Sequence, residues 1–197
     1  MSCLPPGTER LPYEAVPGRA ERSPRGNSAG DNLLQVRLRP LALDEAAALL
    51  AGTGRPAAGL RWHEEYPMTE TLTALGMVVA AHRAAGEPLP ATPSWWLHQI
   101  VLGDQVVGDV GFHGPPPLTG RVEVEIGYNV VEGLRGRGIA TRACGLILEQ
   151  AWRDGAAVVL AETGAGNVAS HQVLLHCGFA GRRGRYEHPR PTGSSLR

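Results

Sequence analysis

The sequence predicts an α+β domain of three layers, in which a mixed, mostly antiparallel central sheet carries helices on both faces. Two observations support this prediction. Segments of alternating hydrophobicity, typical of strands, occur among segments of helical periodicity in the order strand, helix, helix, three strands, helix, strand, helix, strand. One of these helices lies between two predicted strands, and a right-handed crossover through it places both strands side by side in parallel.

The composition fits one folded domain of a reduced protein. The chain has 197 residues, and its 19 basic and 19 acidic residues balance, which leaves no electrostatic footprint for nucleic acid or an anionic membrane. The cysteines Cys3, Cys144 and Cys177 lack the spacing of metal ligands. The first residues do not resemble a signal peptide, and no apolar segment reaches the roughly 18 residues of a membrane span. We therefore expect a cytoplasmic protein that holds no metal and binds neither nucleic acid nor membrane.

The apolar content of a folded domain is confined to the middle of the chain. Residues 1–31 are rich in proline and poor in aliphatic side chains, which predicts a disordered or loosely docked tail. Residues 32–188 contain the predicted elements and form the domain. Residues 189–197 are predicted to be a polar C-terminal tail.

The domain begins with a strand and two helices. Residues 34–40 alternate in hydrophobicity as a strand does. Residues 43–50 are good helix formers, and Gly52 follows them as a stop signal. A cluster of aromatic and ionisable residues spans 60–67, and a second helix is predicted over 69–85.

Three antiparallel strands are predicted next. Residues 95–102 and 105–112 flank Gly103-Asp104, a spacing that is typical of a hairpin. A proline- and glycine-rich loop then leads into a third strand, which begins at Val122.

The last third of the domain contains a strand, a helix and a strand. Residues 157–161 are a continuous apolar run, as expected for a strand buried on both faces. Asn167 is a good N-cap for a helix that extends to about His176. Residues 181–189 are predicted to form one final strand.

The stretch 122–151 combines a strand, a glycine-rich turn and a helix. Val124 and Ile126 alternate with polar residues, a basic turn spans 134–138, and from Ile139 apolar residues recur at every fourth position. The first turn of such a helix has free N–H groups and partial positive charge from the helix dipole. Glycines let this backbone approach a ligand closely, so the turn is a predicted phosphate-binding site.

Two common phosphate-binding motifs do not fit this turn. A P-loop requires Lys followed by Ser or Thr after its last glycine, whereas Gly138 is followed by Ile139 and Ala140. A dinucleotide-binding motif that starts at Gly136 requires Gly or Ala at the position of Thr141. The turn therefore predicts neither nucleotide hydrolysis nor dinucleotide binding.

A different family motif does fit. The pattern Arg135-x-x-Gly138-x-Ala140 resembles the [QR]-x-x-G-x-[GA] motif of the GNAT superfamily of N-acetyltransferases. Further blocks between about residues 33 and 179 resemble the branch that contains the ribosomal-protein alanine acetyltransferases, and they lie at 108–112, 125–128, 135–141, 167–170 and 177–179. The resemblance implies a GNAT-like acyl-CoA N-acyltransferase fold.

The resemblance also implies a binding mode for acetyl-CoA as co-substrate. It would lie in a V-shaped opening between the strands at 122 and 157, splayed by a bulge near 128–130. The turn would bind its pyrophosphate, and Asn167 would bond its pantetheine or cysteamine end. The implied cofactor-binding residues are Tyr128, Val130, Arg135, Gly136, Arg137, Gly138, Ile139, Ala140, Asn167 and Ser170. Asn167 as a plain helix cap and Ser170 as a surface serine are the alternatives.

Three residues are candidates for proton transfer from the attacking amine or to the leaving thiolate. Glu125 is one candidate base, on a strand face that it shares with Glu123, and His113 is another. The tyrosine that many family members use as an acid falls at Leu174, so Ser170, a water or no group takes that role. A solvated sheet face for Glu125 and a structural role for His113 are the competing interpretations.

Substrate groups in this family usually enter between the first two helices. In this chain that segment contains Trp62, Glu64, Glu65 and Tyr66, and carboxylates beside aromatic rings suit a cationic amine. Packing of the rings beneath a loop, with solvated carboxylates, is the alternative interpretation.

The resemblance also implies a final hairpin, but only residues 180–197 follow Phe179. We therefore expect that the last strand is missing, or that a partner chain in a homodimer supplies its neighbour. The predicted function is an acetyl-CoA-dependent N-acetyltransferase that acts on a primary amine, of a small molecule or a protein N-terminus, by direct attack in a ternary complex. An acyl-CoA-binding regulatory or degenerate domain without turnover is the alternative.

Overall fold

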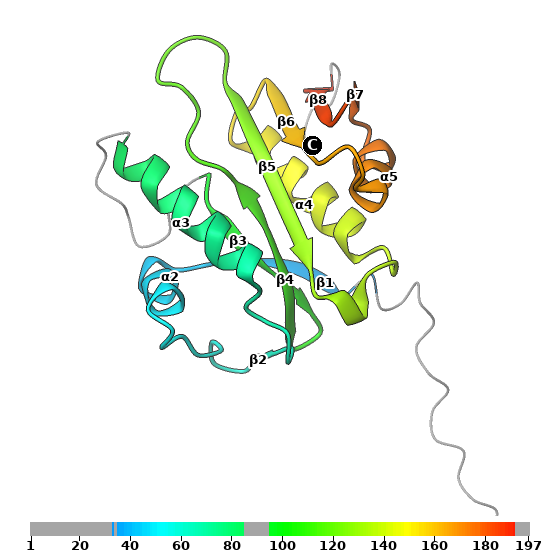
Figure 1. Ribbon diagram of the computed structural model, residues 1–197. Coiled ribbons are helices and arrows are strands. Elements are labelled where there is room, and N and C mark those ends of the chain that lie inside the picture. The colour runs from blue at the N-terminus through cyan, green and yellow to red at the C-terminus, as the bar shows by residue number, and fades with distance from the viewer. Residues whose placement is uncertain (1–32, 34, 85–94, 192–197) are drawn as a thin grey trace, which may run out of the picture.

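The computed structural model describes residues 33, 35–84 and 95–191. The predicted tail at 1–31 lies outside the described residues, as does the part of the C-terminal tail beyond residue 191. Within the described part, strands and helices follow the predicted order and form the expected α+β fold (Figure 1). The structure adds one short strand after the first helix and splits the last predicted strand in two.

A mixed sheet of eight strands forms the middle layer. Its strands run in the order β1-β3-β4-β5-β6-β8-β7, and β2 pairs with β4 beside this path. The β5–β6 and β2–β4 pairs are parallel, and the other pairs are antiparallel. The strands are β1 (Val36–Pro40), β2 (Arg61–Trp62), β3 (Leu97–Leu102), β4 (Gln105–Phe112), β5 (Glu123–Val130), β6 (Val158–Glu162), β7 (Ala180–Arg182) and β8 (Arg185–Pro189).

Helices cover both faces of this sheet, with α2 and α3 at one side and α4 and α5 at the other (Figure 1). Thr71 of α3 bonds to Asp109 on one face of β4, whereas α4 shares a buried apolar cluster with Val110 on the opposite face. None of the described helices has the length and apolar content that a membrane crossing requires. The helices are α2 (Leu43–Leu50), α3 (Thr69–Ala84), α4 (Ile139–Arg153) and α5 (Val168–His176), and a 3₁₀ helix, η1, spans Glu132–Leu134.

The two faces of β5 have the opposite character that its alternating sequence predicts. Val124 and Ile126 are 3% and 1% exposed and belong to the cluster that includes the apolar side of α4. Glu123 and Glu125 are half-buried and point to the other face, because successive side chains of a strand alternate. β5 therefore supplies core residues on one face and carboxylates on the other.

The predicted V-shaped opening lies between β5 and β6. β5 pairs with β6 only over Glu123–Glu125, whereas it pairs with β4 from Ile126 to Val130. The two parallel strands therefore separate after Glu125. The expected bulge near 128–130 is wrong, because the β4–β5 register runs without a shift, and the shift in this half of the sheet lies between β3 and β4 at Ile100/Val101.

The sheet ends in a hairpin, so the expected loss of the last strand is wrong. β8 pairs with β6, and β7 pairs with β8 at the sheet edge. Arg183 and Gly184, which connect β7 to β8, have φ values of +58° and +85°, the positive values of a tight hairpin turn. A partner chain is therefore not needed to supply the strand next to β6.

This hairpin depends on a glycine opposite β8. A Cβ added at Gly181 would collide with the carbonyl oxygen of Arg185, so we expect Gly181→Ala to lower the free energy of unfolding by about 1–3 kcal/mol. Gly76→Ala in α3 is the matched control, because no atom lies within 4 Å of the added Cβ and alanine favours a helix by about 0.5–1 kcal/mol. Urea denaturation measures both. Wild-type stability of Gly181→Ala would contradict the close β7–β8 approach.

Candidate active site

A cavity of about 1060 Å³ opens where β5 and β6 separate, between the end of β5, the start of α4 and the start of α5. All but one of the predicted cofactor-binding residues line it. Those residues are Tyr128, Val130, Arg135, Gly136, Gly138, Ile139, Ala140, Asn167 and Ser170. The exception is Arg137, which is exposed outside the cavity. Segments that are far apart in the chain thus meet in one cleft.

The glycine-rich turn presents backbone N–H groups to this cleft. Gly136 and Gly138 have φ values of +72° and +77°, a left-handed conformation that glycine adopts without a steric penalty. Gly138 caps α4, whose first intrahelical hydrogen bond runs from Arg142 N to Gly138 O, so the preceding helical N–H groups have no helical acceptor. The first turn of α4 has no acidic residue. The turn is therefore suited to bind an anion.

The arginines of the turn also hold its backbone. The Arg135 Nε–H donates to the carbonyl oxygen of Val130 at 2.9 Å, and an Arg137 guanidinium N–H donates to that of Gly133 at 3.2 Å. Arg142, which sequence reasoning missed, adds a further cation to the cleft. Its position four residues after Gly138, one helical turn along α4, is the signal that could have identified it.

Two tyrosines from different strands hold the start of α5. The Tyr128 hydroxyl, on β5, donates to the carbonyl oxygen of Ser170 at 3.2 Å. The Tyr186 hydroxyl, on β8, lies 2.7 Å from His171 Nδ1. His171 Nε2 lies 3.2 Å from the carbonyl oxygen of Ala165, to which only an N–H can donate, so Nδ1 accepts the Tyr186 proton. Burial raises the pKa of Tyr128, so its phenol keeps its proton.

Asn167 has the predicted capping geometry. Its side-chain oxygen accepts the Ser170 backbone N–H at 3.1 Å, and both residues line the cleft. Helix capping and ligand contact can therefore coexist at Asn167. Leu174, at the position of the family's usual tyrosine, is 1% exposed in the core and offers no proton donor.

His113 and Glu125 form a pair at the point where β5 and β6 separate. His113 Nδ1 lies 3.1 Å from Glu125 Oε1, and the His113 backbone N–H donates to the Glu125 carbonyl at 2.9 Å. The hydrogen bond from His113 outweighs partial burial and lowers the pKa of Glu125. A Cβ at Gly127 would lie 2.7 Å from His113 Nε2, so the imidazole covers the glycine.

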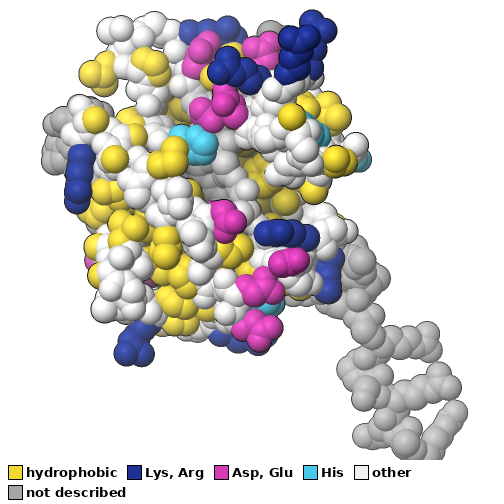
Figure 2. Space-filling model, in the orientation of Figure 1, with side chains coloured by type: hydrophobic (Ala, Val, Ile, Leu, Met, Phe, Trp, Pro, Cys, Tyr) yellow, Lys and Arg dark blue, Asp and Glu magenta, His cyan; other side chains and the backbone are white. Residues whose placement is uncertain are grey.

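This pair lies on the carboxylate face of β5 and does not line the cleft on the α4 side. Glu123, on the same face, forms an ion pair with Arg121, with 3.8 Å between Oε1 and the guanidinium nitrogen. On the face of the molecule drawn in Figure 2, acidic side chains and a histidine lie around a hollow. The α4 side of β5 is thus suited to anions and the other side to cations.

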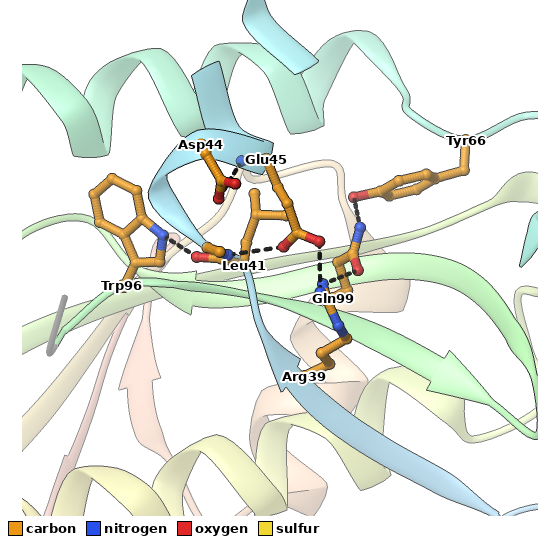
Figure 3. Close-up of polar contacts among 8 residues, drawn as sticks. Arg39, Leu41, Asp44, Glu45, Tyr66, Trp96 and Gln99 are labelled. Atoms are coloured by element: carbon orange, nitrogen blue, oxygen red, sulfur yellow. Dashed lines mark hydrogen bonds and ion pairs between the residues drawn. The ribbon is translucent and has the colours of Figure 1, made fainter. Parts of the chain in front are cut away.

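The predicted substrate segment has a different position in the structure. Tyr66 is 5% exposed, and its hydroxyl accepts a hydrogen bond from Gln99, which itself accepts one from Arg39, the partner of Glu45 (Figure 3). The Trp62 ring packs edge-on against Tyr66 at 5.6 Å between centroids. The two rings therefore pack within the fold, and a role for them in binding the amine stays a prediction.

The two carboxylates of that segment also lie outside the cleft. Glu64 is exposed, and Glu65 accepts hydrogen bonds from the backbone N–H groups of Glu132 and Gly133. None of the four predicted substrate residues lines the cleft, and their role in binding the amine stays a prediction. The carboxylate that does line the cleft is Glu70, in the first turn of α3.

A buried carboxyl next to Glu70 was missed from the sequence. Asp109 of β4 is 2% exposed, accepts a hydrogen bond from Thr71, and lies opposite Asn129 of β5, which lines the cleft. Burial raises the pKa of Asp109 to about 7, although hydrogen bonds from Thr71 and Asn129 oppose the rise. An aspartate within the apolar run of β4 was the available signal.

One comparison with known proteins identifies a family. Residues 35–180 match the family described as acetyltransferase (GNAT) domain. No curated protein matches the chain by sequence.

Solved structures with the same fold include the ribosomal-protein-S5-alanine acetyltransferase from Vibrio fischeri, with a TM-score of 0.53 and 15% identity, covering 80% of this chain and 94% of that one. RimJ from Mycobacterium smegmatis, in complex with CoA disulfide, has a TM-score of 0.51 and 22% identity, covering 77% and 79%. YncA from Salmonella typhimurium, with its cofactor acetyl-CoA, has a TM-score of 0.51 and 17% identity, covering 82% and 97%. At these identities the likeness is one of fold.

The pKa of Asp109 predicts a pH dependence of stability. An unfolded aspartate titrates near pH 3.9, so between about pH 4 and 7 the folded state binds the extra proton and its stability falls as the pH rises. We expect Asp109→Asn to remove this slope, so that the variant gains about 2–4 kcal/mol relative to wild type across that range.

Urea denaturation at a series of pH values measures this difference. Asp104→Asn is the matched control, because that exposed carboxylate has a pKa lowered by its hydrogen bond from Arg61 and affects stability only in acid, with the opposite sign. Parallel stability curves for Asp109→Asn and wild type would mean that Asp109 titrates normally.

Proposed function

The chain belongs to the GNAT family of acetyltransferases, and we propose that it transfers the acetyl group of acetyl-CoA to a primary amine by direct attack in a ternary complex. The amine belongs to a small molecule or to a protein N-terminus. The observation that carries the proposal is the opening between β5 and β6, which has an anion-binding turn on one side and a His–Glu pair at its apex.

The residues of the cleft fit acetyl-CoA. The cavity of about 1060 Å³ is slightly larger than the usual range for small-molecule and cofactor sites, about 300–1,000 Å³, as a ligand of the size of acetyl-CoA requires. The N–H groups at the start of α4, with Arg135 and Arg142 beside them, suit the pyrophosphate. β6 leaves the end of β5 unpaired, so the Val130 backbone borders the space for the pantetheine, and Asn167 lines the same cleft.

We assign proton removal from the amine to the pair His113 and Glu125. The Nδ1–H of His113 donates to Glu125, which its lowered pKa keeps ionised, so Nε2 is the free basic nitrogen. Nε2 lies over Gly127, just beyond the last residue that pairs with β6. An ammonium group titrates near pH 10.4 in a lysine and about 7.7–8.0 at an N-terminus, so a base is needed at neutral pH.

Ser170 is the candidate hydroxyl donor to the departing thiolate, and Tyr128 and Thr141 are the other hydroxyl side chains that line the cleft. The Tyr128 phenol keeps its proton and already donates to the Ser170 carbonyl. A thiol has a reference pKa of about 8.5, so the departing thiolate needs only a hydrogen-bond donor and not a strong acid. Loss of the family's tyrosine at Leu174 is therefore compatible with turnover.

Carboxylates on the α3 side of β5 favour a cationic acceptor substrate. Glu70 of α3 lines the cleft, and Glu125 of β5 lies on the face of the sheet that α3 covers. The Vibrio fischeri structure is described as a ribosomal-protein-S5-alanine acetyltransferase, so a peptide with an N-terminal alanine is one acceptor to test. The alternative, an acyl-CoA-binding domain without turnover, now rests on Leu174, because the C-terminal hairpin is present.

Calorimetric titration with acetyl-CoA, followed by an assay of free thiol release across a panel of amines and N-terminal peptides, tests the proposal. Absence of acetyl-CoA binding would contradict the cofactor assignment. Binding without thiol release on any acceptor would favour the domain without turnover.

The His113–Glu125 pair can be tested by rate. General-base catalysis contributes about 10²–10⁴-fold, so we expect His113→Ala and Glu125→Gln each to lower kcat about a hundredfold without changing the Kd for acetyl-CoA. Glu123→Gln is the control, since this neighbour on the same face pairs with Arg121. Equal rates for all three variants would assign the base elsewhere.

The anion-binding turn can be tested by charge. Ala140 lines the cleft in the first turn of α4, so Ala140→Glu places a carboxylate where the pyrophosphate binds, and we expect the Kd for acetyl-CoA to rise at least about a hundredfold. Ala47→Glu, the same substitution at an exposed position of α2, is expected to bind like wild type. Calorimetry measures both. Tight binding by Ala140→Glu would exclude this turn as the pyrophosphate site.

A further inference from the structure

Glu65 connects the segment before α3 to the anion-binding turn. One carboxylate oxygen accepts the backbone N–H of Glu132 at 2.5 Å, and the other accepts that of Gly133 at 3.3 Å. We propose that Glu65 is a positioning residue, which holds the turn at 134–140 in its ligand-ready conformation and thereby sets the affinity for CoA. The proposal rests on the cofactor part of the proposed function and not on the acceptor or the base.

The backbone that carries Glu65 is fixed to the sheet. The Arg61 N–H donates to the Asp104 carbonyl and the His63 N–H to the Val106 carbonyl, each at 3.0 Å, so β2 pairs firmly with β4. The Tyr66 N–H then donates to the His63 carbonyl at 2.9 Å. The Tyr66 hydroxyl is held by Gln99. The carboxylate of Glu65 is therefore presented from a rigid base.

Glu132 and Gly133, which bond to Glu65, also bond to two residues of the anion-binding turn. Glu132 O accepts the backbone N–H of Arg135 at 3.1 Å, and Gly133 O accepts the Arg137 guanidinium at 3.2 Å. Movement of Glu132 and Gly133 would therefore break one hydrogen bond to each of the two arginines. The effect of Glu65 reaches the first turn of α4 through these two carbonyl groups.

The physical basis is preorganisation. Glu132 and Gly133 begin the 3₁₀ helix η1, and the first N–H groups of a helix have no acceptor within it. A carboxylate is a strong acceptor for such groups, because hydrogen bonds to a charged group are shorter and stronger than neutral ones. A turn that is already ordered loses less conformational entropy when it binds its ligand. Loss of the carboxylate should therefore appear as weaker CoA binding.

The test compares Glu65→Gln and Glu65→Ala with Glu64→Gln. Glu64 is the adjacent residue and is exposed as Glu65 is, and its substitution removes the same charge from the same segment. We expect calorimetry to show about tenfold weaker CoA binding for the Glu65 variants and wild-type binding for Glu64→Gln. Circular dichroism shows whether each variant is folded. If Glu65→Ala does not fold, the isosteric variant Glu65→Gln alone is compared with Glu64→Gln.

A second ligand separates positioning from general destabilisation. Pantetheine lacks the pyrophosphate, so its binding, followed by NMR titration, should be the same in wild type and in the Glu65 variants. Unchanged CoA affinity of both Glu65 variants, or an equal loss for CoA and pantetheine, would overturn the proposal. Failure of the wild-type protein to bind CoA would instead contradict the cofactor assignment, and the result does not depend on any acceptor amine.

Discussion

The separation of β5 from β6 after Glu125 is the constraint on which the site depends. A central strand normally satisfies its backbone groups on both sides, yet β5 keeps β4 as a partner up to Val130 and loses β6 after three residue pairs. The unpaired edge of β5 forms one wall of the cleft, and the helix that returns the chain to β6 begins there with its N–H groups exposed. Topology therefore creates the cleft, and individual side chains determine its charge and shape.

The C-terminal hairpin supports this opening from its other side. β8 pairs along β6, and its Tyr186 bonds to His171, the residue after Ser170 at the start of α5. α5 is therefore held by β8 as well as by Tyr128 from β5. The two walls of the cleft are connected through a helix rather than through a strand-to-strand ladder, which leaves the space between them free.

Local features of the site were predictable from the sequence, and long-range ones were not. The alternation of β5, the glycine-rich turn and the Asn167 cap each depend on a few adjacent residues, and each was predicted. The hairpin was missed because Arg183 has a positive φ, for which arginine gives no signal. The contact between Glu65 and Glu132 spans 67 residues, and a sequence of two adjacent glutamates does not reveal which one reaches the N–H groups of Glu132 and Gly133.

Both edges of the sheet have properties that resist pairing with another chain. At one edge, β7 has only three residues, all of them exposed and one of them an arginine. At the other, β1 carries Arg37 and Arg39 and ends at Pro40, which lacks a backbone donor. Short, charged or proline-terminated edge strands oppose edge-to-edge growth of sheets. The sheet is therefore open in its middle, where β5 and β6 separate, while both of its outer edges resist aggregation.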